Sequence, residues 1–291
     1  MKKLLVTGAS GFLGWNLCQL AQSEWEVYGV YGSQGLVIPG VNLFKADLRN
    51  FQDLKTLFAE IKPAAVIHTA AKSKPNYCQT HPEESYAVNV EASLNIAGLC
   101  ADYQIPCAFT STDLVFDGLN PPYQETDAVS PVCIYGEHKL QAEQGMLARY
   151  PKTAVCRMPL MFGMVPPTAS TFIQPFLKAM RAGEELKLFT DEIRTAVSGT
   201  SAAKGLLLAL AKVEGVIHLG GKESMSRYDF GQLMAQVWGL SKDNLKPCLQ
   251  EDVPMAAPRS PNTSMDSSRA FALGYQPLSM REELEFLRDK I

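Results

Sequence analysis

The chain has 291 residues, of which 46% are hydrophobic and 20% are charged, a balance typical of globular proteins and unlike that of disordered or fibrous chains. The formal net charge of -3 provides no basic field for nucleic acid or anionic lipid, so neither is expected as a partner. The length permits one large domain or two unequal domains.

The first part of the chain alternates short apolar runs with segments of helical pattern. Leu4–Val6 ends in a glycine turn, which is typical of a buried parallel strand. Asn50 is a candidate N-cap for the second helix, with Asp53 at the third position of a capping box. In chain order the pattern predicts a helix over 12–23, strands over 26–31 and 41–48, a helix over 51–61, a strand over 64–71, a helix over 82–103, a strand over 106–111, a helix over 135–149 and a strand over 153–157.

The regular alternation fades after Pro159, where prolines and short apolar segments follow, with a further helix near 228–238. We therefore expect an α/β fold: a doubly wound parallel Rossmann sheet with right-handed crossovers and a smaller C-terminal substrate lobe. A helix over 201–210 is expected to pack back on the sheet. The predicted NAD(P)-binding domain is 1–158 plus about 195–213, and the predicted lobe is 159–194 plus 214–291.

A glycine-rich turn follows the first predicted strand and opens the first helix. Its spacing is G-x-x-G-x-x-G, and it meets the demands of a dinucleotide site, namely a tight turn, close backbone approach to a pyrophosphate and a helix N-terminus facing it. The alternative is an ordinary strand–helix turn. The residues that the turn offers to a cofactor are Gly8, Ser10, Gly11, Phe12, Leu13 and Gly14.

The end of the second predicted strand bears on the choice of cofactor. An NAD site usually carries an acidic residue there for the ribose hydroxyls. Residues 29–34 hold no Asp, Glu or Arg, while Ser33 and Gln34 could donate hydrogen bonds to a phosphate. The pattern favours NADP(H), with NAD as the other option.

Tyr135 and Lys139 stand four residues apart, one turn from each other on one face of a predicted helix. Thr112 ends the fifth predicted strand, at the sheet edge where open α/β folds bind ligands. A nearby ammonium is expected to lower the pKa of the phenol, which suits proton transfer near neutral pH. Thr112, Tyr135 and Lys139 are therefore the candidate catalytic residues, and a surface Tyr–Lys pair is the alternative.

At this point the chain resembles the extended short-chain dehydrogenase/reductases, and within them the dTDP-4-dehydrorhamnose reductase family and its relative, the regulatory β subunit of methionine adenosyltransferase. The match is good over about the first 160 residues and loose beyond them. The motifs that carry it are GASGFLG at 8–14, STDLVFDG at 111–118, PPYQETD at 121–127 and YGEHKL at 135–140.

The resemblance implies that Thr112, Tyr135 and Lys139 act as a triad, and that Asp113 and Arg194 face the substrate. For Arg194 a surface salt bridge is the alternative, for Asn89 a hydrogen bond to a neighbouring loop, and for Lys72 a solvated loop charge. Further cofactor contacts are implied at Asp47, Leu48, Ala70, Ala71, Lys72, Asn89, Tyr135 and Lys139.

Three features depart from the wider pattern or add to it. Leu114 stands where related sugar-nucleotide dehydratases place an acid, which argues against elimination chemistry, and Gly199 replaces an expected acidic residue. The four histidines show no metal-ligand spacing, so no metal is expected. His138 is expected to be exposed to solvent.

The function expected first is an NADP(H)-dependent reductase of a nucleotide-linked 4-keto sugar, in which a Tyr protonates the oxygen that receives the hydride. Two alternatives remain open: a cofactor-binding regulatory subunit like the methionine adenosyltransferase β subunit, and a sugar-nucleotide epimerase. A nucleotide sugar is the expected small-molecule partner. A homodimer is the base-rate expectation for a soluble oligomer.

The cysteines and the N-terminus bear on the compartment. Seven cysteines lack motif spacing and several have apolar neighbours, so reduced core thiols are expected. The N-terminal apolar run stops at Gly8 without the pattern of a signal peptide, and no stretch is long enough to span a bilayer. We expect a cytoplasmic protein.

Overall fold

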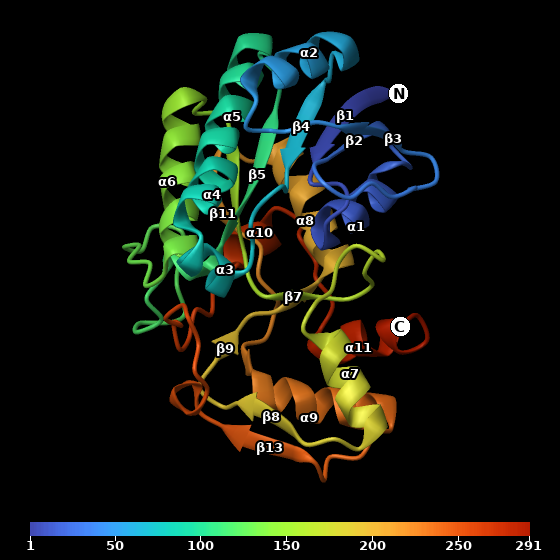
Figure 1. Cartoon of the computed structure of the whole chain (residues 1–291), viewed down its shortest axis with the longest axis vertical. Coiled ribbons are helices and arrows are strands. Elements are labelled where there is room, and N and C mark those ends of the chain that lie inside the picture. The colour runs from blue at the N-terminus through green and yellow to red at the C-terminus, as the bar shows by residue number, and fades with distance from the viewer.

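The computed structural model describes residues 1–291 and centres on a seven-stranded parallel sheet (Figure 1). The strand order is β11-β6-β5-β4-β1-β2-β3, so the order reverses between β1 and β4. Ligands in such sheets bind at the carboxyl ends of the strands beside this reversal. The strands are β1 (Lys2–Thr7), β2 (Trp25–Tyr31), β3 (Asn42–Lys45), β4 (Ala65–His68), β5 (Cys107–Thr112), β6 (Ala154–Met158) and β11 (Gly215–His218).

Helices cover both faces of the sheet and bury it in two apolar clusters (Figure 1). On one face, side chains such as Leu17 and Leu206 pack α1 and α8 against the strands. On the other, Phe58, Ile96 and Met146 pack α2, α5 and α6. These helices are α1 (Phe12–Ala21), α2 (Phe51–Ile61), α5 (Ala92–Tyr103), α6 (Ile134–Arg149) and α8 (Gly199–Lys212).

A smaller lobe hangs below the carboxyl edge of the sheet and has its own apolar core (Figure 1). Phe162, Phe172 and Phe230 meet edge to face there, with ring centroids 4.9 to 6.1 Å apart. Its paired strands are β7 (Met161–Phe162) with β10 (Val197–Ser198), β8 (Leu186–Phe189) with β13 (Leu245–Cys248), and β9 (Ile193–Arg194) with β12 (Met225–Ser226). Its longer helices are α7 (Ile173–Ala182), α9 (Arg227–Trp238) and α11 (Met280–Arg288).

Short helical segments complete the chain. They are α3 (Pro75–Thr80), α4 (Pro82–Tyr86), the π-helical turn η1 (Ala87–Glu91), the 3-10 turns η2 (Asp113–Val115) and η3 (Gln250–Asp252), and α10 (Ser268–Ala272). The helix expected over 82–103 is thus three segments, because the backbone widens to a π turn at its middle. No helix combines the length and the apolar character needed to cross a membrane.

The expected fold class is confirmed, with one correction to the limits of the lobes. Residues 215–218 were expected in the smaller lobe, yet β11 pairs in parallel with β6 at the edge of the main sheet. Helix α8 supplies the crossover that a parallel strand needs, and so returns the chain to this edge. The other limits of the two lobes stay predictions.

Candidate active site

A cavity of about 680 Å³ opens at the carboxyl edge of the main sheet, beside the reversal of strand order. Its walls come from the turn after β1, the ends of β2 to β6 and the first turns of α6. A volume of this size lies within the usual range for small-molecule and cofactor sites. The cavity therefore stands where the topology predicts a ligand.

The glycine turn fits tightly between β1, α1 and the exit of β4. Gly8 has φ +74°, and a Cβ built on it would lie 2.7 Å from the backbone N of Ala70. A Cβ on Gly14 would lie 2.2 Å from the Gly8 carbonyl oxygen. Because both clashes are with backbone, these two positions require glycine.

Helix α1 begins without a side-chain cap. Gly11 is its N-cap residue and offers no side chain, so the N–H groups of the first turn lack a side-chain cap, and Phe12 and Leu13 of this turn line the cavity. Such a helix N-terminus attracts anions because its N–H groups and dipole face them. The turn thus fits the pyrophosphate of a dinucleotide.

The end of the cavity at β2 and β3, away from α6, carries charges that the sequence pattern did not single out. Arg49 Nη2 lies 2.6 Å from Asp47 Oδ2, and this guanidinium lowers the pKa of the Asp47 carboxyl. Lys45 and Ser33 line the same end. The available signal was proximity in sequence, since Lys45 and Arg49 flank Asp47, which the resemblance had already implicated.

The loop after β4 forms a wall of the cavity, and hydrogen bonds with the Asn89 side chain hold this loop in place. Asn89 Oδ1 accepts from the backbone N–H of Lys72 at 2.9 Å, and Asn89 Nδ2 donates to the Lys72 carbonyl at 3.0 Å. Asn89 is fully buried and does not line the cavity. It contacts the loop, as the alternative interpretation held. Lys72 lines the cavity and pairs with Glu84 at 2.7 Å.

Tyr135 and Lys139 line the cavity from α6, and Thr112 lies beside Tyr135 at the end of β5. Burial raises the pKa of Tyr135, while the neighbouring Thr112 acts in the opposite direction. Burial lowers the pKa of Lys139 to about 7, against the attraction of Glu143. The expectation that Lys139 lowers the pKa of Tyr135 is therefore wrong for this structure, because desolvation dominates both groups.

Three further side chains surround the phenol. Cys78, Cys133 and Ala257 form a small buried cluster with Tyr135, which packs the chain at Ala257 against α6. His138, expected to be exposed, is 7% exposed and shares a 2.8 Å hydrogen bond with Ser85 Oγ. The helix turns His138 toward α4, where a serine is its partner, rather than toward solvent.

All seven cysteines are free thiols, and all but Cys248 are buried.

The cavity gathers most of the residues singled out from the sequence. Thr112, Asp113, Asn89 and Arg194 are not among its lining residues. Met158, the last residue of β6, and Met161, the first of β7, line it although nothing in the sequence drew attention to them. The predicted residues that do line it are Gly8, Ser10, Gly11, Phe12, Leu13, Gly14, Asp47, Leu48, Ala70, Ala71, Lys72, Tyr135 and Lys139.

A comparison with protein families gives a match over nearly the whole chain. The family model described as "RmlD substrate binding domain" covers residues 1–290. The chain belongs to this family. The RmlD match includes the smaller lobe, where the resemblance seen in the sequence was loose, so the expected membership among dTDP-4-dehydrorhamnose reductase-like proteins is confirmed.

Relatives of this RmlD-family chain include proteins of two kinds. Methionine adenosyltransferase 2 subunit beta of Xenopus tropicalis is 28% identical over 99% of this chain and 89% of its own length. A solved dTDP-4-dehydrorhamnose reductase from Clostridium acetobutylicum is 25% identical, with a TM-score of 0.86 over 99% of this chain and 98% of its own. A dTDP-4-dehydrorhamnose reductase from Bacillus anthracis, solved with NADP, is 23% identical, with a TM-score of 0.86 over 100% of both chains.

Proposed function

We propose that the protein is an NADP(H)-dependent reductase of a nucleotide-linked 4-keto sugar. The observation that carries this proposal is a shared cavity: the glycine turn after β1 and the Tyr135–Lys139 pair of α6 line the same 680 Å³ space. An anion-binding helix start and a proton donor in one cavity suit reduction of a carbonyl.

The residues of the chain divide the remaining work. A bound nicotinamide would supply the hydride. The raised pKa of Tyr135 keeps its phenol protonated at neutral pH, as a proton donor to the substrate oxygen requires. Thr112, whose single proton is donated to Asp113 Oδ1, acts only as an acceptor and orients the neighbouring Tyr135 phenol. Lys139, whose pKa burial lowers to about 7, would bind the nicotinamide ribose.

The preference for NADP rests on the far end of the cavity. No carboxylate follows β2 there, and Ser33, Lys45 and Arg49 line that end. The relative from Bacillus anthracis was solved with NADP. A 2′-phosphate would find hydroxyl and cationic partners in this region and meet only Asp47, which Arg49 already neutralises. NAD is the alternative cofactor, and tighter binding of NADH than of NADPH would favour it.

The direct test is cofactor oxidation. The protein is mixed with NADPH and a panel of dTDP-4-keto and related keto sugars, and the absorbance of NADPH is followed. We expect turnover with at least one sugar, and a loss of about 10²- to 10⁴-fold in Tyr135→Phe, which lacks the donor hydroxyl. Oxidation no faster than in Tyr135→Phe across the panel would contradict the proposal.

A second candidate function is that of a regulatory subunit, favoured by the methionine adenosyltransferase relative that spans 99% of this chain. Stable co-purification with a methionine adenosyltransferase, together with NADPH binding and no keto-sugar turnover, would support it. An epimerase, the other alternative, would keep its dinucleotide through purification, whereas free exchange of cofactor counts against it.

A further inference from the structure

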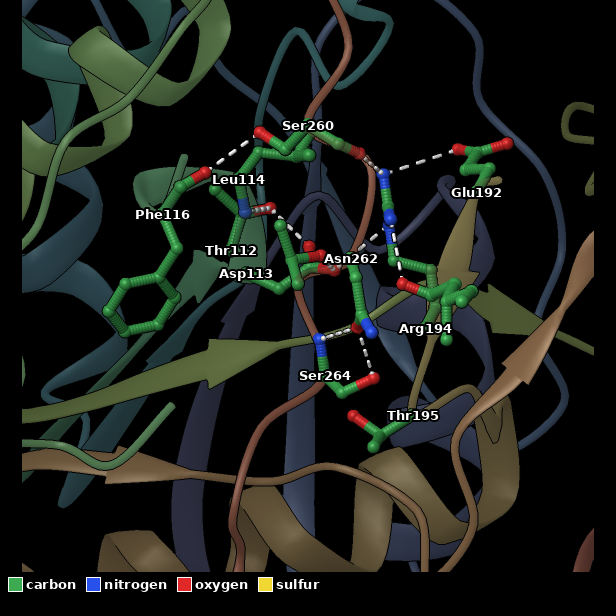
Figure 2. A network of polar contacts seen from close by, with 12 residues as sticks. Thr112, Asp113, Leu114, Phe116, Glu192, Arg194, Thr195, Ser260, Asn262 and Ser264 are labelled. Carbon is green, nitrogen blue, oxygen red and sulfur yellow. Dashed lines mark hydrogen bonds and ion pairs between the residues drawn. The ribbon is translucent and has the colours of Figure 1, made fainter. Parts of the chain in front are cut away.

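Arg194 has its hydrogen-bonding capacity committed inside the protein. Its side chain is 4% exposed and projects from β9 toward the C-terminal segment (Figure 2). Arg194 Nη2 donates to the Ser260 carbonyl at 2.8 Å, and Nη1 donates to the Pro261 carbonyl at 3.1 Å. Nε lies 3.4 Å from Asp113 Oδ2. A guanidinium held this way has little left to offer a substrate.

Asp113 is the partner that links this arginine to the main sheet. It follows β5 directly in η2 and is 4% exposed. Thr263 Oγ1 donates to Asp113 Oδ2 at 2.6 Å, while Arg194 faces the same oxygen. The carboxylate therefore joins the strand end of the larger lobe, β9 of the smaller lobe and the C-terminal segment 260–264.

The second oxygen of Asp113 acts on the candidate catalytic threonine. Thr112 Oγ1 donates to Asp113 Oδ1 at 3.1 Å and accepts from the backbone N–H of Leu114 at 3.2 Å (Figure 2). A hydroxyl has one proton, so these two bonds fix both the direction of its O–H and the position of its oxygen. One lone pair of Thr112 Oγ1 remains free to accept a further hydrogen bond, and Tyr135 is a neighbouring donor.

Among the charged groups that act on the Asp113 carboxylate, only Arg194 supplies a compensating positive charge. Glu192, which precedes β9, adds a second carboxylate, and Tyr135 faces Asp113 from α6. Glu192 is held by Arg227 Nε at 3.0 Å and lies 3.4 Å from Arg194. Removing Arg194 would leave a buried carboxylate without its cation, a costly state that favours rearrangement.

We propose that Asp113 is a positioning residue for the reduction described above: it aims the Thr112 hydroxyl, and Arg194, seated on segment 260–264, holds Asp113 in place. This inference rests on the proposed function. It reassigns Asp113 and Arg194, which the resemblance had placed against the substrate. Docking of the smaller lobe thereby completes the arrangement of the catalytic residues.

The test compares Asp113→Ala and Asp113→Asn with Arg227→Met as a matched control. Asn keeps an acceptor oxygen for Thr112, and Ala does not. Arg227 belongs to the same buried cluster and pairs with Glu192, without contact to Asp113. For each variant, kcat, KM and NADPH affinity are measured, together with thermal stability.

We expect Asp113→Ala to lose about 10- to 100-fold in kcat, as misplacement of a catalytic group does, with NADPH affinity within a factor of about two of wild type. Asp113→Asn should recover most of that loss. Arg227→Met should lose stability and keep its kcat. Equal losses of kcat in Asp113→Ala, Asp113→Asn and Arg227→Met, in step with stability, would overturn the proposal.

Crystal structures of the variants provide a readout that needs no turnover. In Asp113→Ala the Thr112 side chain should leave its present rotamer, and in Arg227→Met it should keep it. If Asp113→Ala does not fold, Arg194→Met takes its place with the same expectation. An unchanged Thr112 rotamer refutes the positioning role even in an active enzyme, whereas absence of turnover in wild type refutes the proposed function alone.

Discussion

His68 shows how a single buried residue is held in one protonation state. Ser93 Oγ donates to the Asn89 carbonyl at 2.7 Å, so it must accept from His68 Nε2–H at 3.0 Å. His68 Nδ1 is then the acceptor for the Thr7 hydroxyl at 2.6 Å. Burial lowers the pKa of His68 to about 3, with Lys139 adding to the effect. The imidazole is therefore neutral and its tautomer is fixed by its neighbours.

The buried neutral imidazole of His68 predicts that the folded protein loses stability at acidic pH. In the unfolded chain His68 gains a proton near pH 6.5, whereas the folded protein resists until about pH 3. The unfolded state thus binds more protons in this window, and stability falls as pH falls through it, by up to about 1.4 kcal/mol per pH unit. Urea unfolding of wild type and His68→Asn between pH 7 and pH 4 should show the smaller slope in the variant. Identical slopes would refute the assignment.

The lowered pKa of Lys139 predicts that folding stability also depends on pH in the neutral to alkaline range. Its pKa is about 7 in the folded protein against 10.5 for the free group, because burial disfavours the ammonium. The unfolded chain therefore binds more protons between these values, and wild-type stability gains from Lys139 deprotonation as pH rises. Lys139→Met should be more stable than wild type near pH 6, and this advantage should shrink toward pH 10. Thermal unfolding across that range tests it, and an advantage that grows with pH would contradict it.

At the scale of elements, the local sequence predicted helix α2 correctly but did not predict the short segments η1 and α3. Asn50 caps α2 as predicted, accepting from Gln52 N–H and Asp53 N–H, and the helix bounds agree with 51–61. The π turn η1 could not be predicted, because Asn89 within it bonds to the distant loop at Lys72 and Ser93 beyond it bonds to His68. The short helix α3 was also missed, because its six residues are too few to form a recognisable pattern.

The junction of β1 and α1 yields a prediction with an internal control. In Gly14→Ala the new Cβ would lie 2.2 Å from the Gly8 carbonyl oxygen, so backbone must shift at the cavity wall. We expect a loss of roughly 1–3 kcal/mol and at least a tenfold loss in NADPH affinity. Gly98→Ala in α5, with its nearest atom at 3.9 Å, should instead gain up to about 1 kcal/mol. Denaturant unfolding and a fluorescence titration measure both, and equal behaviour of the two variants would refute the argument.

For the whole molecule, the sheet edge was predictable and the seam between the lobes was not. Parallel strands end at one edge, so motifs after β1, β4 and β5 meet in one cavity although they are far apart in sequence. The burial of Arg194 depends on segment 260–264, which pairs with it from 66 residues away in the chain. The place of β11 likewise depends on which sheet edge was still free. Neither the burial of Arg194 nor the place of β11 can be predicted from the local hydrophobic periodicity.

The C-terminal segment also joins the two lobes mechanically. The Tyr123 N–H donates to the Ser264 carbonyl at 2.8 Å, and the Asp266 N–H donates to the Tyr123 carbonyl at 2.7 Å. The same segment bonds the smaller lobe, where the Ile193 N–H donates to the Pro261 carbonyl at 2.8 Å. A segment bonded on both sides couples the lobes, so we expect them to unfold together rather than in two steps.

A single tryptophan can report this coupling. The chain has three, and Trp238 lies in the smaller lobe, where its indole donates to the Leu284 carbonyl at 2.8 Å. Trp15→Phe combined with Trp25→Phe leaves Trp238 as the only fluorophore of its kind. NADPH at about 100 times its Kd should add about 2.7 kcal/mol of stability. Because the cofactor cavity lies in the larger lobe, the melting of Trp238 should shift with NADPH as far as the far-UV circular dichroism does. A Trp238 transition that stays in place while the helix signal moves would show that the lobes unfold independently.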